Sequence, residues 1–223
     1  MKNGKSAYLL DNSVHGEDGY LIKELSDTTC LDVVLDGVTR FGGKEAVELA
    51  VETLQQASFQ KAEDLFAVLQ QINANLYLQG GGRFLMSTIV VTLKLGDELH
   101  IVRAGDSLAY VVREGAIYET ASIVDGLYAT AITGGLGFRE NFSYSYSKMM
   151  LRSGDRLVLM TDGIADNLAL GEQVSIVNEA SAPQGIVDVL QGLINEKRVS
   201  RVGPTGYTHA YVEDDRSLVV RFF

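Results

Sequence analysis

The sequence predicts an α+β fold in which two packed antiparallel sheets are covered by helices on their outer faces. Three observations lead to this prediction. Apolar residues recur at helical spacing in two adjacent segments and again near the C-terminus. Between these segments the period changes to that of β-strands separated by glycine-containing turns. Because helices and strands come in blocks, the pattern favours layered sheets over alternating βαβ units.

Length and composition fit one domain spanning residues 1–223, and they exclude several classes of protein. Apolar residues make up 46% of the 223-residue chain, which is enough for a sizeable core. No run approaches ~18 apolar residues, so we expect no membrane span. No long apolar stretch follows the N-terminal lysines, so we expect no secretory signal. A formal net charge of −10 argues against a nucleic-acid partner.

Cys30 is the sole cysteine, which excludes an internal disulfide and a thiolate metal cluster. It lies within an apolar run and is therefore expected to be a small buried core residue. Such sparing use of cysteine suits a reducing, cytoplasmic location.

The first part of the chain is predicted to contain a strand or hairpin, a buried strand and two helices. The ranges are 8–22 for the strand or hairpin, 31–36 for the buried strand, and 43–57 and 62–78 for the helices. The second helix places its apolar residues at helical spacing, namely Leu65, Leu69, Ile72 and Leu76. Two neighbouring helices of this length can cover one face of a sheet.

The remainder is predicted to be mostly strands. An antiparallel meander is expected over 84–95, 98–104 and 108–113, with turns at Gly96-Asp97 and Gly105-Asp106. A further turn is expected at Glu114-Gly115. The other expected elements are strands at 141–148, 156–161 and 217–222 and a helix at 184–198.

Two of the predicted buried strands end in the same dipeptide. The first runs into Asp36-Gly37 and the second into Asp162-Gly163. The glycine leaves the backbone uncrowded, so that a carbonyl or an ion can approach closely. Two such strand ends placed side by side would form an oxygen-lined pocket suited to Mg²⁺ or Mn²⁺. Each dipeptide alone is also a common hairpin turn, so neighbouring features must decide.

Further acidic residues flank strands at three other places. Glu17-Asp18 and Glu213-Asp214-Asp215 precede predicted strands, and Gly105-Asp106 lies at a strand end. Carboxylates crowded together repel one another unless cations neutralise them. The pattern therefore favours a divalent-cation site.

The order of these segments resembles the metal-dependent protein phosphatases of type 2C in their compact bacterial form, which includes the sporulation-type serine phosphatases. The resemblance runs over residues 17–220 and implies a four-layer αββα sandwich of two antiparallel sheets flanked by helix pairs. The matching segments, in family order, are Glu17-Asp18, Asp36-Gly37 with Gly42-Gly43, Met86-Ser87-Thr88, Ala104-Gly105-Asp106-Ser107 with Ala109-Tyr110, Ile132-Thr133-Gly134-Gly135-Leu136-Gly137, Gly154-Asp155 through Thr161-Asp162-Gly163, and Asp214-Asp215-Arg216-Ser217.

The resemblance also implies a site for two or more Mg²⁺ or Mn²⁺ ions at one end of the sandwich. Asp36 would bridge both ions and the Gly37 carbonyl would bind one of them, while Asp162 and Asp214 would bind the other. Glu17 and Asp18 would act mostly through bound waters. The catalytic residues implied are Asp36, Asp162 and Asp214, and the nucleophile is a water held between the ions, which can acidify it.

The chain departs from the family pattern beside this site. The family usually has an arginine a few residues before its Glu-Asp pair, and residues 11–16 contain none. Two residues are candidates for binding the phosphate instead: Arg40, in an insertion after Gly37, and His15. For each of them the plainer interpretation is a loop or turn side chain in solvent. The segment 119–131 is also shorter than the mobile flap that usually covers the family's site.

We therefore expect an enzyme, a protein serine/threonine phosphatase that hydrolyses phosphoserine and phosphothreonine in a phosphorylated protein partner. It is expected to be a monomeric bacterial signalling protein with neither nucleic acid nor membrane as partner. Two alternatives remain open. The missing arginine and short flap would suit a non-catalytic regulatory or binding module, and the open cleft would suit a phosphatase for small metabolites.

Overall fold

The computed structural model describes residues 1–81, 84–120, 134–200 and 211–223. Helices and strands alternate in blocks, as the sequence predicts. The strands are β1 (Lys5–Asp11), β2 (Gly19–Ser26), β3 (Thr29–Leu35), β4 (Ile89–Leu95), β5 (Glu98–Ala104), β6 (Leu108–Arg113), β7 (Ala116–Thr120), β8 (Ser145–Met150), β9 (Arg156–Met160) and β10 (Arg216–Phe222). The helices are α1 (Gly43–Gln56), α2 (Ala62–Gln79), α3 (Asp162–Ala165), α4 (Leu170–Glu179) and α5 (Pro183–Ser200).

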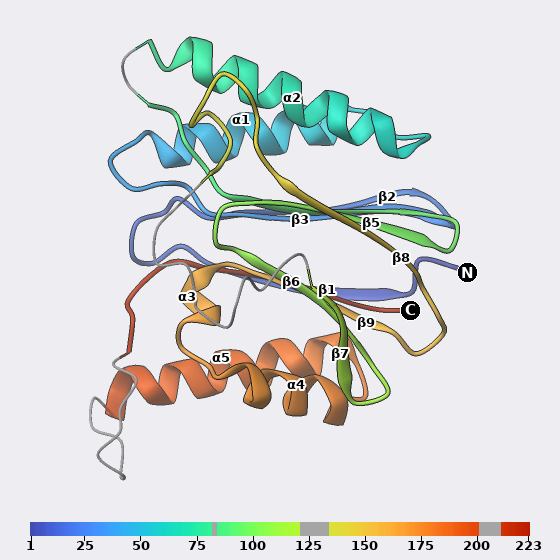
Figure 1. Cartoon of the computed structure of the whole chain (residues 1–223). Coiled ribbons are helices and arrows are strands. Elements are labelled where there is room, and N and C mark those ends of the chain that lie inside the picture. The colour runs from blue at the N-terminus through green and yellow to red at the C-terminus, as the bar shows by residue number, and fades with distance from the viewer. Residues whose placement is uncertain (82–83, 121–133, 201–210) are drawn as a thin grey trace.

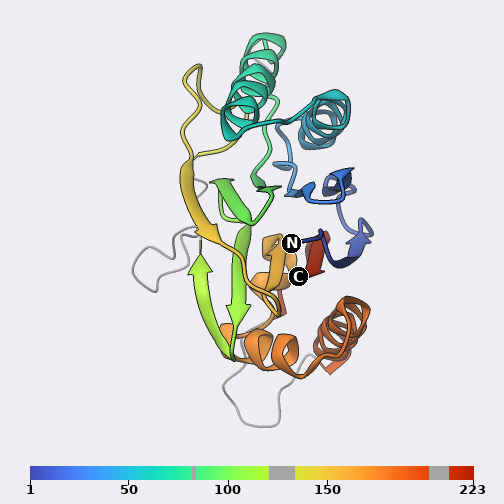
Figure 2. The same cartoon turned by 90° about the vertical axis from the view of Figure 1, so that its right-hand side faces the viewer.

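These elements form four layers. One antiparallel sheet has the strand order β2-β3-β4-β5-β8, and the other has the order β1-β10-β9-β6-β7. Helices α1 and α2 cover the first sheet, and α4 and α5 cover the second (Figure 1). Figure 2 views the sandwich from the end at which both termini lie and shows the two sheets between the helix pairs. The predicted four-layer αββα sandwich is confirmed.

Central strands contribute to two cores at once. In β3, Leu31, Val33 and Leu35 pack toward the helices, whereas Val34 faces the opposite sheet. Strands buried on both faces carry apolar residues on both sides and do not alternate. The one charged residue within β3, Asp32, is buried in an ion pair with Arg221. Among the described helices, none combines the length and the apolar character needed to cross a bilayer.

Two predicted connections differ from the structure. The alternative of a hairpin within residues 8–22 is wrong, because β1 and β2 belong to different sheets. The predicted meander is right for β4 and β5 but wrong at Gly105-Asp106, where the chain crosses to the other sheet and continues as β6. Gly105 has φ +104 and packs against Thr88 so closely that a Cβ would lie 2.6 Å from the Thr88 Cβ. This tight crossing places Asp106 between the end of β5 in one sheet and the start of β6 in the other.

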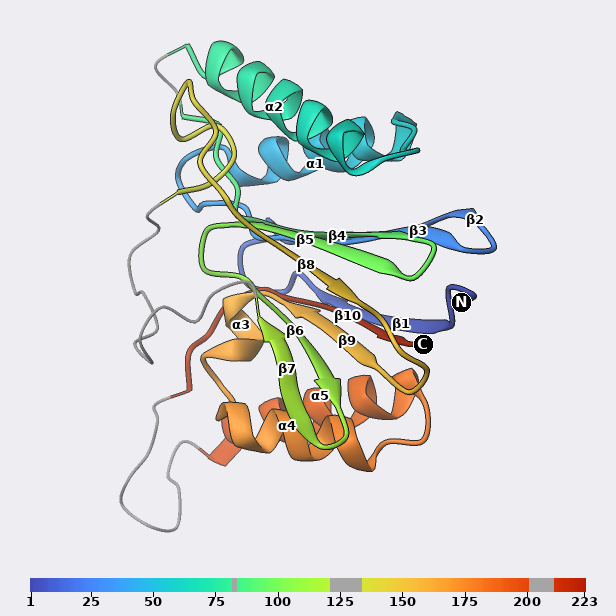
Figure 3. The ribbon, with the colours of Figure 1, turned by 45° about the vertical axis from the view of Figure 1, so that its right-hand side comes forward.

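Most predicted elements lie within a few residues of their observed bounds. The exceptions are β4 and β8, which begin five and four residues later than predicted, at Ile89 and Ser145. The turn at Glu114-Gly115 is confirmed as the hairpin between β6 and β7, with both residues at positive φ. Figure 3 shows this hairpin extending toward α4, a helix that the sequence analysis did not predict. The segment predicted as a short flap, 119–131, falls almost entirely outside the described residues.

Candidate metal centre

The strand register brings five acidic residues to one end of the sandwich. Because β2 and β3 are antiparallel, with Gly19 opposite Leu35, the start of β2 lies beside the end of β3. Likewise Leu218, near the start of β10, and Leu108, at the start of β6, both lie opposite Met160 at the end of β9. The termini lie at the other end of the sheets (Figure 1). The acidic residues at these strand ends are Asp18, Asp36, Asp106, Asp162 and Asp214.

Asp36 is held by the segment that leads into β4. Its backbone N–H donates to Thr88 Oγ1 over 3.2 Å, and its carbonyl accepts hydrogen bonds from the Thr88 N–H and the Ser87 hydroxyl. The Thr88 hydroxyl in turn bonds Ser107, next to Asp106. The Met86-Ser87-Thr88 segment therefore acts as a brace that fixes two of the acidic residues.

Gly37 lies where the chain after β3 passes the start of α1. A Cβ on Gly37 would lie 2.5 Å from the backbone of Gly43 and 2.7 Å from the carbonyl of Glu17. Only glycine fits this crossing. The Gly37 N–H also donates to the Glu17 carbonyl, so the Asp-Gly dipeptide is a packed crossing and not a hairpin turn.

Three carboxylates form the tightest cluster at this end. Asp36, Asp106 and Asp162 each offer an oxygen, and these oxygens all lie within 4.8 Å of one another. The structure therefore brings together the two Asp-Gly carboxylates that the sequence singled out. It adds Asp106, which the sequence analysis noted at a strand end but did not name as a site residue. The sequence signal that could have identified Asp106 is its Gly-Asp dipeptide. This dipeptide resembles a hairpin turn, but it follows a strand that ends at the same end of the sandwich as Asp36 and Asp162.

Burial and mutual repulsion hold protons on this cluster. Burial, followed by the charge of Asp18, raises the pKa of Asp36 to about 10. Burial, followed by the charges of Asp106 and Asp214, raises the pKa of Asp162 to about 7. Burial is also the main cause that raises the pKa values of Asp18, Asp106 and Asp214. A bound cation would therefore stabilise these carboxylates in their ionised form.

Asp214 and Asp215 are adjacent, but their carboxylates differ in hydrogen-bond partners and in the direction of their pKa shifts. The carboxylate of Asp214 accepts one N–H, from Asp215, and lies 3.8 Å from His15 Nε2. The carboxylate of Asp215 is buried and accepts backbone N–H groups from Val14, His15 and Glu17. Burial raises the pKa of Asp215, but these hydrogen bonds outweigh it and hold the pKa below its ordinary value. Of the pair, Asp214 is thus the one left to face the cluster.

The remaining predicted site residues surround the cluster at different depths. Asp18 is buried and accepts a hydrogen bond from Thr161 Oγ1 over 2.8 Å, which links it to the residue before Asp162. Glu17 accepts a hydrogen bond from Thr39 Oγ1. Arg40 is exposed, at φ 72, in the turn that follows Gly37. A left-handed conformation is uncommon for a residue with a side chain and marks a constrained turn.

The donor set fits divalent metal ions of the hard class. Asp106 Oδ1 and Asp162 Oδ1 are buried without a hydrogen-bond partner. Buried polar atoms normally have partners, so two bare carboxylate oxygens in one cluster call for a cation. Carboxylate and carbonyl oxygens are the ligands that Mg²⁺ and Mn²⁺ prefer.

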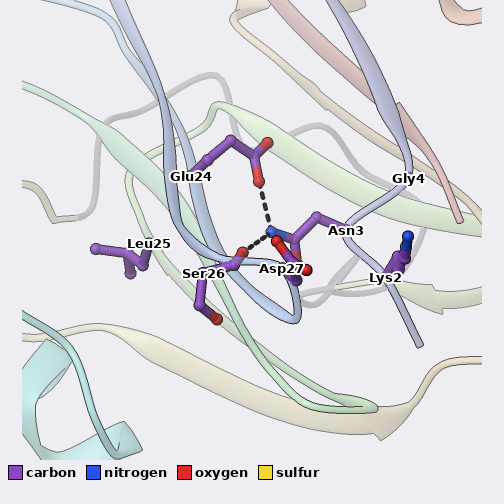
Figure 4. A pocket seen from close by; sticks show the side chains of 7 residues that line it. All are labelled: Lys2, Asn3, Gly4, Glu24, Leu25, Ser26 and Asp27. Atoms are coloured by element: carbon purple, nitrogen blue, oxygen red, sulfur yellow. Dashed lines mark hydrogen bonds between the residues drawn. The ribbon is translucent and has the colours of Figure 1, made fainter.

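A pocket lies at the opposite end of the first sheet from the carboxylate cluster, beside the β2–β3 turn (Figure 4). It is lined by Lys2, Asn3, Gly4, Glu24, Leu25, Ser26 and Asp27. The Asn3 amide donates hydrogen bonds to Glu24 and to the Ser26 carbonyl, so the polar groups there satisfy one another. The carboxylate cluster is therefore the stronger candidate site.

Comparisons with known proteins agree with this fold. The family model for Stage II sporulation protein E (SpoIIE) matches residues 45–221. A search of curated proteins found no match. The structure is similar to that of PppA, described as a key regulatory component of T6SS in Pseudomonas aeruginosa, with TM-score 0.80 and 25% identity, covering 98% of this chain and 97% of that one.

Two further solved structures share the fold at lower identity. The serine/threonine phosphatase Stp1 from Staphylococcus aureus has TM-score 0.79 and 19% identity, covering 100% of this chain and 97% of that one. The serine/threonine phosphatase of S. agalactiae has TM-score 0.77 and 18% identity, covering 98% and 99%.

Proposed function

Because the chain belongs to the Stage II sporulation protein E (SpoIIE) family of type 2C-like phosphatase domains, we propose that it hydrolyses phosphoserine and phosphothreonine in proteins with the help of divalent metal ions. The observation that carries the proposal is the meeting of Asp36, Asp106 and Asp162, with two of their oxygens buried and bare. Residues 1–223 would form one catalytic domain.

The proposed metal ligands are acidic side chains and one backbone carbonyl that lie at or near the strand ends. Asp36, the Gly37 carbonyl, Asp162 and Asp214 would hold two Mg²⁺ or Mn²⁺ ions, and Glu17 and Asp18 would act through water. When bound, the ions supply the Lewis acid that activates water and neutralises the phosphoryl oxygens. Asp162, whose pKa is raised to about 7 by burial and by the charges of Asp106 and Asp214, would be stabilised in its ionised form by a bound cation.

The protein's own contribution is orientation and phosphate binding. The braces from Thr88 to Asp36 and from Thr161 to Asp18 fix the carboxylates before any ion arrives. Arg40 is the proposed phosphate ligand, because it is exposed in the turn next to Gly37 and a guanidinium binds phosphate in a fork. His15 Nε2 is the second candidate, since it lies beside Asp214.

Hydrolysis of an aryl phosphate and of phosphoserine and phosphothreonine peptides tests this proposal. We expect turnover that requires Mn²⁺ or Mg²⁺, stops with EDTA and is lost in Asp162→Asn. The matched control is Asp188→Asn, an exposed acid on α5, which should keep wild-type activity. Activity that survives both EDTA and Asp162→Asn would refute the proposal.

A second candidate function is that of a non-catalytic module that binds metal and a phosphorylated partner. It is favoured by the absence of arginine from residues 11–16 and by the regulatory description of the PppA structure. Mn²⁺ binding without turnover on any phosphopeptide would support this candidate over the first. Faster turnover of sugar phosphates than of phosphopeptides would instead indicate a phosphatase for small metabolites.

We further propose that the protein acts on phosphorylated proteins in the bacterial cytoplasm, as a monomer. The net charge of −10 supports the exclusion of nucleic acids as partners. Light scattering coupled to size-exclusion chromatography tests the monomer: a mass near 24.2 kDa is expected, and twice that mass would contradict it.

A further inference from the structure

The connection between β1 and β2 is bound by a side chain from the far end of the sequence. Asp215 Oδ1 accepts the backbone N–H groups of Val14 and His15 over 2.9 and 3.0 Å, and its Oδ2 accepts that of Glu17 over 2.9 Å. The side chain that forms these bonds belongs to a residue only 2% exposed. Asp215 therefore binds three backbone N–H groups of residues 14–17, a segment that lies outside both sheets.

This position chemically requires an ionised aspartate. Three N–H groups converge on one side chain, and a carboxylate offers acceptors only. Asparagine would turn an amide N–H₂ toward one of these donors, and alanine would leave all three part-buried donors without this partner. Hydrogen bonds from N–H groups to a charged carboxylate are roughly twice as strong as those between neutral groups.

The captured segment carries ligand candidates from one sheet to the other. Glu17 and Asp18 follow directly, at the start of β2 in the first sheet, whereas Asp215 stands at the start of β10 in the second sheet. The backbone N–H of Asp215 also donates to Asp214 Oδ1 over 2.9 Å. One residue thus fixes the position of Asp214 in one sheet relative to Glu17 and Asp18 in the other.

From this arrangement we infer that Asp215 is a positioning residue of the metal centre, which keeps the acidic groups of the two sheets at the spacing that a divalent ion needs. We assign it no ligand role, because both of its oxygens already accept backbone N–H groups. The inference rests on the metal centre of the proposed function but not on turnover. Residues that orient metal ligands without touching the ion typically change metal affinity 10–100-fold when they are replaced.

The test measures Mn²⁺ binding by calorimetric titration, together with the Tm of the metal-free protein. We expect Asp215→Asn to weaken Mn²⁺ binding about tenfold, and Asp215→Ala to weaken it further. Glu213→Gln is the matched control for charge, since Glu213 is an exposed acid two residues away and should bind Mn²⁺ as the wild type does.

A control for stability separates positioning from general weakening of the fold. Asp32→Asn breaks a buried ion pair with Arg221 between the sheets and should lower the Tm while leaving Mn²⁺ affinity unchanged. The inference is overturned if folded Asp215→Asn binds Mn²⁺ within twofold of the wild type, or if Asp32→Asn loses affinity to the same extent. Wild-type protein that bound no Mn²⁺ would overturn the metal centre itself and this inference with it.

Discussion

Replacing Asp162 by asparagine should make the metal-free protein more stable while removing much of its response to metal. Asp162 has its pKa raised from 3.8 to about 7, first by burial and then by the charges of Asp106 and Asp214. The folded state therefore binds the Asp162 proton more tightly than the unfolded state does. Linkage then requires the contribution of Asp162 to wild-type stability to be greatest below pH ~4 and to be lost as the pH rises through about 7.

The size of the effect follows from that shift. About three pKa units at 1.36 kcal/mol each give an upper limit of ~4 kcal/mol at pH 8. A buried asparagine amide that lacks one partner returns ~1–3 kcal/mol of this, which leaves a net gain of ~2 kcal/mol. In a chain of this length 1 kcal/mol shifts the Tm by ~2–4 °C. Asp162→Asn should thus melt ~4–8 °C above the wild type at pH 8 in EDTA. Near pH 4 the wild-type carboxyl is protonated and only the amide's cost of ~1–3 kcal/mol remains, so the variant should melt below the wild type.

Scanning calorimetry across pH 4–8, with EDTA or with Mn²⁺, measures both parts of this prediction. Mn²⁺ at 100 times its dissociation constant should stabilise the wild type by ~2.7 kcal/mol and Asp162→Asn by much less. Asp188→Asn, exposed on α5, should follow the wild type in every condition. A variant that melts below the wild type at pH 8 in EDTA, or that gains as much from Mn²⁺, would refute the electrostatic reasoning.

Three further predictions concern residues around and behind the site. Arg40→Ala should raise the KM for an aryl phosphate about tenfold without changing the Tm. Arg40→Lys should recover only part of the loss, because an ammonium cannot bind phosphate in a fork as a guanidinium does. An unchanged KM would show that Arg40 does not bind the phosphate. Asp32→Asn should destabilise the fold by ~3 kcal/mol in urea unfolding, because Arg221 loses its bidentate partner in the interior; a loss under ~1 kcal/mol would contradict this. The Cys30 thiol, whose pKa burial raises to about 12, should react with a disulfide reagent only on unfolding; rapid reaction of the native protein would show that it is accessible.

Local patterns in the sequence predict most of the elements, because the apolar residues of helices and of strands recur at different spacings. The stripe Leu65, Leu69, Ile72 and Leu76 identifies α2, and the apolar run of residues 30–35, interrupted only by Asp32, identifies a strand buried on both faces. Helix α4 escapes this reasoning, because Gln173 is buried where an apolar residue would be expected, with its amide bonded to the Leu168 carbonyl. The start of α4 is signalled only by Glu172, which accepts the backbone N–H of Ala169.

The sheet to which a strand belongs is not written in its local pattern. Gly105-Asp106 has the composition of a hairpin turn, yet β5 and β6 pair with different neighbours, since Leu108 lies opposite Met160 in β9. The same long-range pairing makes Asp106 a member of the acidic cluster. Similarly, Asp214 and Asp215 cannot be told apart by type, and only the N–H groups that converge on Asp215 separate their roles.

Crystals soaked in Mn²⁺ and measured at the manganese absorption edge test the central claim most directly, since anomalous peaks locate each ion without reference to any assay. The account predicts two peaks within ligand distance of Asp36, the Gly37 carbonyl, Asp162 and Asp214. Crystals with full diffraction and no anomalous peak between these carboxylates, or with peaks only elsewhere on the surface, would contradict it.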